Sequence, residues 1–321
     1  MNTTIHQIVR GDNLSLTESK ALFDDLFAGN RDDAEILTLL AALNSRPETA
    51  SELAGATLAL RSAMGTTSPP RLPATRVCNV DCTTTGAILD TTVALAASEL
   101  DVSVLVAAND PLGDDDRPEA YRQLDVPVCI GERDGLDALR RRKLAAVYDR
   151  QLRRVNRRAV GAGQFGPANI LTVASAFARP VRAGQVLCEV PSADLCAPLA
   201  RTLALLGYRQ AAVLATDGPV RTRLAHLRKA GEVVEQTIPL PVRTKDVRHH
   251  ALPNSLHRGV RYLVGDQVPE DVHRALAYRT ALLALAGEPD EPFGVLFDGA
   301  LKCLESGRLA PRFARSVRRW A

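Results

Sequence analysis

The hydrophobic pattern of this chain changes its period near residue 65, and this change restricts the fold more than any other feature. Up to Met64 the apolar residues recur at helical spacing. A stretch rich in threonine and proline, 66–73, follows, and beyond it short β-rich runs alternate with amphipathic stretches. The sequence therefore predicts an α/β protein, with a small all-helical N-terminal domain and a larger α/β domain that contains a mostly parallel central sheet.

Three short helices are expected in the N-terminal part. Ser15 with Glu18, and Thr49 with Glu52, have the spacing of capping boxes, in which each side chain accepts a hydrogen bond from the other residue's backbone N–H. Between the two boxes, 34–43 is apolar on one broad face. The residues expected to form the helical core and a dimer surface are Leu37, Leu40, Leu43, Leu53 and Leu60.

The rest of the chain has the alternation of strands and helices that is typical of a parallel sheet with helices on its faces. The expected domain boundaries are 1–68 for the helical domain, completed by a returning segment at about 165–182, and 69–164 with 183–321 for the α/β domain. Amphipathic helices are expected at 91–100, 195–206 and 221–229. Strands are expected at 76–80, 102–107, 126–130, 186–190, 211–215 and 233–238.

Composition excludes several classes of protein. With 46% hydrophobic and 24% charged residues, the chain has the composition of a globular protein and is neither disordered nor fibrous. No run of about 18 uncharged apolar residues occurs, and the first residues lack the basic and apolar regions of a secretory signal. A cytoplasmic protein with no membrane partner is therefore expected. The six cysteines are scattered without a CxxC pair, which favours buried free thiols over disulfides or zinc ligands.

Charge is distributed unevenly along the chain. Residues 1–138 contain 22 acidic and 10 basic residues, whereas 139–321 contain 15 acidic and 30 basic residues. The first part is therefore acidic and the second basic, although the net charge is only +3. Such polarity is consistent with an anionic partner for the basic part, or with two parts that attract each other.

The most basic segment is 139–160. If this segment is one helix, Leu144, Tyr148, Leu152 and Val155 line one face and basic residues occupy the other. Such a face can contact several phosphates of a nucleic acid. It can equally be a solvated surface that pairs with the acidic part or with a second subunit, or it can bind another anion. The candidate nucleic-acid-binding residues are Arg140, Arg141, Arg142, Lys143, Arg150, Arg153, Arg154, Arg157 and Arg158.

Motifs along the chain resemble those of one enzyme family. The stretch Glu48–Ala56, which reads Glu-Thr-Ala-Ser-Glu-Leu-Ala-Gly-Ala, and the later Met64 are similar in spacing to elements of the anthranilate phosphoribosyltransferase family. That family lies within the wider class that includes pyrimidine nucleoside phosphorylases. Segments 101–110, 180–190 and 199–208 occupy the expected places downstream, so the resemblance spans nearly the whole chain. It also implies a strand near 144–147, which conflicts with a continuous helix over 139–160.

The chain departs from the family where the sugar donor is bound. The family holds the diphosphate of phosphoribosyl diphosphate with a Gly-Thr-Gly-Gly-Asp loop, whose missing side chains let backbone N–H groups approach the phosphates. Here the aligned residues, 78–82, read Cys-Asn-Val-Asp-Cys and contain no glycine. The residues that fall on this degenerate donor pocket are Cys78, Asn79, Asp81, Thr83, Thr84, Thr91, Asn109, Asp110 and Asp217.

The charges of the donor pocket are also changed. The family's Lys-His-Gly-Asn-Arg element falls on 106–110, where only Asn109 matches and Asp110 replaces the last cation. The family's magnesium-binding Asp-Glu pair falls near Asp217, where one carboxylate beside Arg221 makes a poor Mg²⁺ site. Two like charges about 4 Å apart repel by about 4 kcal/mol at an effective dielectric near 20. Ordinary phosphoribosyl transfer is therefore not expected, and no catalytic residue, metal or other cofactor is assigned.

A divergent branch of the same family, with decayed transferase motifs, binds DNA as a homodimer that pairs through its helical domains. The resemblance to that branch implies a catalytically degenerate protein that binds DNA or RNA without sequence preference and forms a homodimer through its helical domain. A glycosyl or phosphoribosyl transferase with a remodelled donor site, an unknown acceptor and a need for Mg²⁺ is the alternative. A scaffold or regulatory homodimer that binds neither ligand is the third hypothesis.

Overall fold

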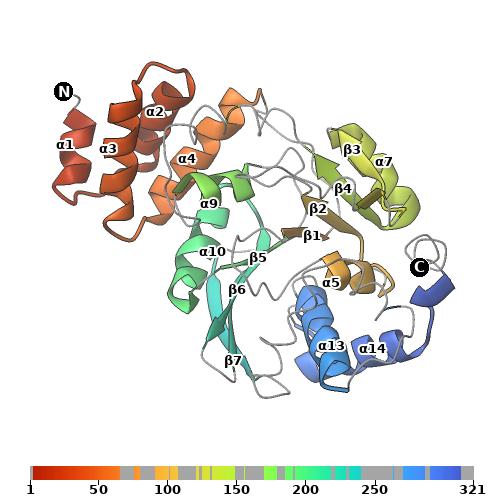
Figure 1. The fold of residues 1–321 in the computed structure, drawn as a ribbon. Helices are drawn as coiled ribbons and strands as arrows, with labels where there is room; N and C mark the ends of the chain where they lie inside the picture. Colours follow the sequence, from red (N-terminus) through yellow and green to blue (C-terminus); the bar gives the residue numbers. More distant parts are fainter. Residues whose placement is uncertain are drawn as a thin grey trace.

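The computed structural model of the chain shows a helical domain beside an α/β domain (Figure 1). Among the helices described, none has the length and hydropathy that crossing a membrane requires. The structure describes residues 3–65, 76–79, 91–100, 102–107, 121–122, 125–130, 132–148, 155, 170–178, 185–190, 192–217, 221–228, 231–239, 263, 270–285 and 290–311.

The N-terminal part contains the three expected helices and one more. Both expected capping boxes are present, so the helix starts at Ser15 and Thr49 are confirmed. In the first box the Glu18 backbone N–H donates to Ser15 Oγ at 3.3 Å, and the Ser15 N–H donates to Glu18 Oε2 at 2.9 Å. The four helices are α1 (Thr3–Val9), α2 (Leu16–Phe27), α3 (Asp33–Asn44) and α4 (Ala50–Ala63).

Glu52 links the helices of this domain through a buried carboxylate. It accepts hydrogen bonds from the backbone N–H groups of Leu14 at 3.0 Å and Thr49 at 2.8 Å. Arg46 donates both terminal guanidinium nitrogens to the same carboxylate. Burial raises the pKa of Glu52, but the hydrogen bonds from Arg46, Leu14 and Thr49 outweigh burial and hold the pKa below its ordinary value. The ionised carboxylate is therefore part of the native packing.

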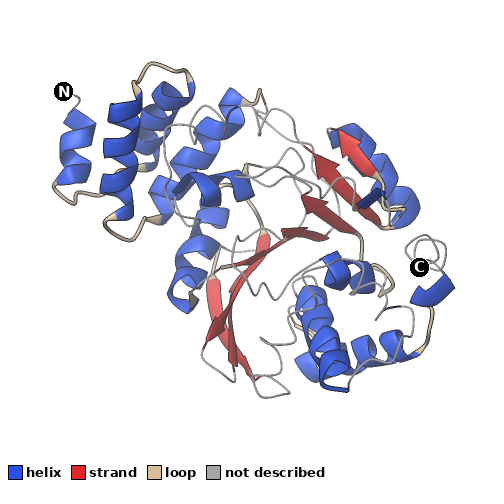
Figure 2. Ribbon diagram, in the orientation of Figure 1, coloured by secondary structure: helices blue, strands red, loops and turns tan. Residues whose placement is uncertain are grey.

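The described strands form one eight-stranded sheet in the order β3-β4-β2-β1-β5-β6-β7-β8 (Figure 2). The first six in this order are parallel, and β7 and β8 extend the sheet with antiparallel pairing. The mostly parallel sheet predicted from the sequence is thus confirmed. The strands are β1 (Arg76–Asn79), β2 (Val104–Ala107), β3 (Val128–Ile130), β4 (Leu144–Tyr148), β5 (Gln185–Glu189), β6 (Gln210–Asp217), β7 (Arg221–Leu227) and β8 (Val233–Pro239).

Helices cover both faces of the sheet. One face packs against α7, α9 and α10, together with the helical domain, and the other face packs against α5 and α13, with α14 beyond them (Figure 1). A short 3₁₀ helix (Ala193–Leu195) precedes α10. The helices that follow α4 in the chain are α5 (Thr91–Ala97), α7 (Glu132–Arg142), α9 (Ile170–Phe177), α10 (Cys196–Leu205), α13 (Glu270–Leu285) and α14 (Phe293–Glu305). Helix α9, in the segment expected to return to the helical domain, contacts α3 and α4.

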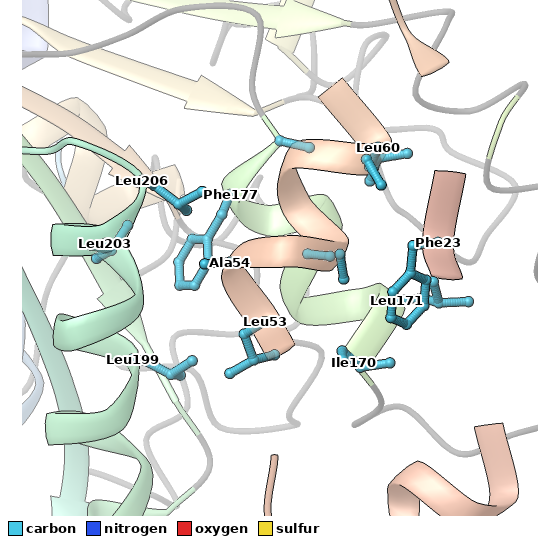
Figure 3. Close-up of a cluster of buried hydrophobic side chains, with 14 of the residues drawn as sticks. Phe23, Leu53, Ala54, Leu60, Ile170, Leu171, Phe177, Leu199, Leu203 and Leu206 are labelled. Atoms are coloured by element: carbon cyan, nitrogen blue, oxygen red, sulfur yellow. The ribbon is translucent and has the colours of Figure 1, made fainter. Parts of the chain in front are cut away.

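One hydrophobic cluster joins the helical domain to the sheet. Figure 3 shows Phe177 of α9 between Ala54 of α4 and the row of leucines on α10. The same cluster continues to Val186 of β5 and Val213 of β6. Of the five leucines expected in the helical core, four are buried, whereas Leu37 is 36% exposed and is a surface residue of α3.

Of the two alternatives for 139–160, the strand near 144–147 that the resemblance implies is present, and a continuous helix is excluded. Helix α7 ends at Arg142, Lys143 has a left-handed φ of 57°, and β4 begins at Leu144. The residues of β4 lie in parallel pairing between β2 and β3, where both faces of a strand are covered. Such a strand is a continuous apolar run, and an apolar run of this length has no period that separates it from a helix.

The expected helix over 221–229 is also wrong, because 221–227 is strand β7. Thr222 and Leu224 face α13, where the Tyr278 hydroxyl donates to Thr222 Oγ1 at 2.8 Å. Ala225 and Leu227 belong to the cluster on the opposite face. Burial of both faces removes the polar-apolar alternation by which a strand is normally identified.

Candidate functional site

The carboxyl ends of the parallel strands form one edge of the sheet, and this edge is the usual ligand site of an open α/β sheet. The six parallel strands β1 to β6 end there. The helical domain packs on the sheet through α9 and α10. The strand-final residues are Asn79, Ala107, Ile130, Tyr148, Glu189 and Asp217.

The structure places part of the predicted donor pocket at this edge. Cys78 and Asn79 are the last two residues of β1, Thr91 is the first residue of α5, and Asp217 is the last residue of β6. The topology therefore brings these four positions to the same side of the sheet. The remaining predicted pocket residues, Asp81, Thr83, Thr84, Asn109 and Asp110, lie outside the described residues.

No Lys, Arg or His occurs among the final residues of the described parallel strands. Instead, two of these strands end in acids: β5 ends in Glu189, which is buried, and β6 ends in Asp217. Arg221, the first residue of antiparallel β7, is directly opposite Asp217 in the sheet register. Anionic diphosphates are bound by cations and backbone N–H groups, so the described part of this edge has few of the required groups.

The described residues do not form the magnesium site that the resemblance implies. A Mg²⁺ ion takes carboxylates in a near-octahedral set of oxygen ligands. Across the described part of the chain, no three His, Cys, Asp or Glu side chains are grouped for metal binding. In the sheet register, the residue directly opposite Asp217 is Arg221, and a cationic residue at this position is unfavourable for a metal site.

A buried arginine ties the helical domain to the rest of this region. Arg61 of α4 is 5% exposed and donates to the backbone carbonyl of Phe177 at 2.8 Å. It also contacts the Tyr208 hydroxyl at 3.3 Å, and its guanidinium lies 5.9 Å from the centre of that ring. Sequence reasoning missed this residue. The sequence signal that could have identified it is the position of an arginine on the apolar face of α4.

The predicted basic residues that the structure describes form an exposed cluster at the end of α7. Arg140 and Arg142 have side chains that are 73% and 50% exposed, and Arg141 and Lys143 are exposed as well. Three arginines in the last turn of a helix interact favourably with its dipole. Their charge thus stabilises the helix and remains on the surface.

Within the part of the chain that the structure describes, Asp125 and Asp137 pair with arginines of this cluster. Arg142 Nη1 donates two hydrogen bonds to Asp125: one to its carboxylate at 3.0 Å and one to its backbone carbonyl at 2.9 Å. Arg140 lies 3.4 Å from the Asp137 carboxylate. These are exposed ion pairs, and such pairs contribute little to stability in water. A phosphate can therefore compete for the arginines.

The cluster does not lie on the edge that carries the donor pocket. Helix α7 immediately precedes β4, so its carboxyl end and Lys143 are at the amino end of that strand. Asp125 precedes β3 at the same edge. The remaining predicted basic residues, Arg150, Arg153, Arg154, Arg157 and Arg158, lie outside the described residues, whereas Val155 packs against the large hydrophobic cluster.

Known proteins resemble this chain in sequence and fold. A family model described as glycosyl transferase family, helical bundle domain, matches residues 2–64. The anthranilate phosphoribosyltransferase of Sorangium cellulosum is 30% identical over 350 residues, which cover 99% of this chain and 95% of that enzyme. The enzyme of Pseudoalteromonas translucida is 26% identical over 226 residues, 68% of this chain and 62% of its own length.

Solved structures share the fold along the full length. The crystal structure of anthranilate phosphoribosyltransferase from Thermus thermophilus superposes with a TM-score of 0.77, at 18% identity, and covers 99% of both chains. The Saccharomyces cerevisiae enzyme in complex with PRPP and Mg gives a TM-score of 0.66 at 12% identity, over 98% of this chain and 97% of that one. Together with the identity to the Sorangium enzyme over nearly the whole length, this places the chain in the anthranilate phosphoribosyltransferase family.

Proposed function

We propose that this chain is a catalytically degenerate member of its family that binds nucleic acid without sequence preference through exposed basic residues. The observation that supports this proposal is the position of the arginine cluster. Arg140, Arg141 and Arg142 are exposed at the end of α7, while the described parallel strands end at the donor edge without a cation. Nucleic-acid backbones bind to surface cations through counterion release, which needs no pocket.

Titration of the protein with fluorescent single-stranded DNA, duplex DNA and RNA at several salt concentrations tests this proposal. We expect a Kd of about 10⁻⁴ M or tighter near physiological salt, and a logarithm of affinity that falls linearly with the logarithm of salt. The triple variant R140A/R141A/R142A should bind about tenfold more weakly at low salt, with a slope smaller by about 2 for single strands.

A matched control removes three exposed cations elsewhere, in the variant R201A/R221A/K302A. This variant should bind with nearly wild-type affinity. Equal losses in the two triple variants would show that net charge alone is measured. Wild-type affinity no better than millimolar at low salt would contradict the proposal.

A second candidate is a pentosyl transferase with a remodelled donor site and an unknown acceptor. The identity to the Sorangium enzyme along the whole chain favours it, because the frame that surrounds the donor edge is retained. Binding of phosphoribosyl diphosphate with Mg²⁺ would raise the melting temperature, since a ligand at 100 times its Kd stabilises the native state by about 2.7 kcal/mol. No shift at millimolar donor would exclude this candidate.

A third candidate is a scaffold or regulatory homodimer that pairs through the helical domain. Val9 of α1 is 60% exposed and Leu37 of α3 is 36% exposed, and these two helices contact each other. Exposed apolar side chains on two neighbouring helices are consistent with an interface between subunits. Light scattering of the wild type and of V9D/L37D should show a dimer and a monomer, respectively.

A further inference from the structure

The amino-terminal edge of the sheet is defined by the register of its strands. Arg76, the first residue of β1, pairs with Val104 of β2 and with Gln185 of β5. Val104 in turn pairs with Leu144 of β4, and Gln185 pairs with Gln210 of β6. The first residues of five parallel strands therefore lie on one line across the sheet.

Basic residues recur along this line. Lys143 directly precedes β4, Arg76 begins β1, and Arg209 directly precedes β6. Strand β7 is antiparallel, so Arg228, which follows its last residue, lies at the same edge. Lys143, Arg209 and Arg228 are exposed. Within the described residues, no ion pair involves the side chain of Arg209 or Arg228.

The length of this line suits an extended polyanion. Neighbouring strands lie about 4.8 Å apart, so the five steps from β4 to β7 span about 24 Å. A stacked nucleic-acid strand carries one charge per about 3.4 Å, so this span corresponds to about seven nucleotides. The cluster at the end of α7 extends the line beyond β4. Exposed acids at the edge include Asp125, which pairs with Arg142, and Glu232 in the β7–β8 turn.

We propose that the amino-terminal edge of the sheet, from the end of α7 to the β7–β8 hairpin, is the track along which the backbone of a nucleic acid lies, with Arg209 and Arg228 contacting phosphates. This inference rests on the proposed function and adds the path of the ligand. Arg209 and Arg228 are distant in sequence from the basic segment 139–160, and only the sheet register aligns them with it. The fit is to phosphate spacing and charge, so it predicts no base preference.

The two ends of β7 provide a matched test. Arg221 and Arg228 are exposed arginines at opposite ends of this strand. We expect R209A/R228A to bind single-stranded DNA about tenfold more weakly at low salt, with a salt slope smaller by about 1.4, because each single-strand phosphate contact contributes about 0.7. R221A should bind within about twofold of the wild type. The variant R209K/R228K keeps the charge and should restore the slope.

The outcomes separate this inference from the proposed function. Wild-type affinity for R209A/R228A, combined with a loss in R140A/R141A/R142A, would overturn the track and leave the proposed function standing. Absence of binding by the wild type would overturn both. Thermal melting of each variant verifies the fold, and R209Q/R228Q serves as the neutral variant if the alanine pair is destabilised. Duplex DNA measured in parallel should show the same ranking of variants with steeper slopes.

Discussion

The two edges of the central sheet carry opposite kinds of residue. At the carboxyl edge, the described parallel strands end in Asn79, Ala107, Ile130, Tyr148, Glu189 and Asp217. At the amino edge, the line of strand ends carries Arg76, Lys143, Arg209 and Arg228, next to the arginines of α7. Among the described strand ends, the two acids thus occur at the carboxyl edge, with Arg221 of β7 beside them, and four cations occur at the amino edge.

This contrast shows that the position of a ligand site and the charge of that site vary independently within one fold. Topology fixes where a ligand site can form, since the carboxyl ends of parallel strands meet at one edge. Charge decides which ligand can bind there. In this chain the helical domain packs on the sheet beside the carboxyl edge, but most cations at the described strand ends lie at the amino edge. The comparison therefore predicts two separate sets of substitutions. Some should change the stability of the fold, and others should change the affinity for nucleic acid.

The largest expected effect concerns the buried carboxylate of Glu52 in the helical domain. Glu52→Gln removes the buried charge that Arg46 faces and, because Leu14 and Thr49 donate to different carboxylate oxygens, places an amide donor against one of these two backbone N–H groups. Breaking a buried pair in this way should lower the free energy of unfolding by about 4 kcal/mol, measured by urea denaturation. Glu18→Gln changes the same capping-box position in α2, where Glu18 is exposed, and should cost much less. Equal losses would show that Glu52 acts only as a cap.

The second effect concerns a buried histidine near the amino edge. Burial, and secondly the charge of Arg228, lower the pKa of His226 to about 4, although Asp290 opposes the shift. Because the folded pKa lies below the unfolded value of about 6.5, the unfolded chain binds the proton first. Stability should therefore fall as the pH decreases from 6.5 to 4, by about 3 kcal/mol in total.

Urea denaturation at pH 7, 5.5 and 4 measures this dependence. The variant H226Q should lose the part of the pH dependence between 6.5 and 4 that belongs to His226, while the contribution of Glu52 remains. In the variant R228A, the pKa of His226 should rise and the acid destabilisation should shrink. Identical pH profiles for wild type and H226Q would contradict the assignment.

The third effect concerns the helix that carries the arginine cluster. A Cβ atom at Gly135 of α7 would lie 2.7 Å from Val147 Cγ2 of β4, so the glycine allows close packing of helix on strand. Gly135→Ala should lower the free energy of unfolding by about 2 kcal/mol through overpacking. Because Val147 is β-branched and stiff, relief requires a smaller residue, and G135A/V147A should recover part of the loss. A stable G135A would indicate that α7 is loosely held.

Most of the strands and the helix starts of the N-terminal domain could be predicted from the sequence. Six strands were predicted within two residues of their observed bounds, because Val-rich runs flanked by turn residues are characteristic of strands. The helix starts at Ser15 and Thr49 were predicted because capping boxes are local motifs. Strand β7 was assigned to a helix, and the residues alone left β4 open between helix and strand, because burial on both faces removes the alternation that distinguishes the two.

The site could be predicted only in part. The sequence identified Arg140–Lys143 as basic, but it could not show that the end of α7 lies at the edge opposite the donor pocket. Arg209 and Arg228 were missed, because each is isolated in the sequence and only the register of β6 and β7 brings them to one line. Such long-range pairings are determined by tertiary packing, and no local pattern encodes them.

The smallest expected effect sharpens the contrast at the amino edge itself. Asp125 is 81% exposed at its side chain and pairs with Arg142 at 3.0 Å, so it competes with a phosphate for that guanidinium. Asp125 has a left-handed φ of 57°, which asparagine also tolerates, so Asp125→Asn removes the charge without straining the turn. Binding of single-stranded DNA at low salt should tighten about threefold, because exposed ion pairs contribute up to about 1 kcal/mol. Glu235→Gln, at the ion pair with Arg223 away from the edge, should leave affinity unchanged. If the two variants behave alike, the amino edge has no special affinity for the ligand.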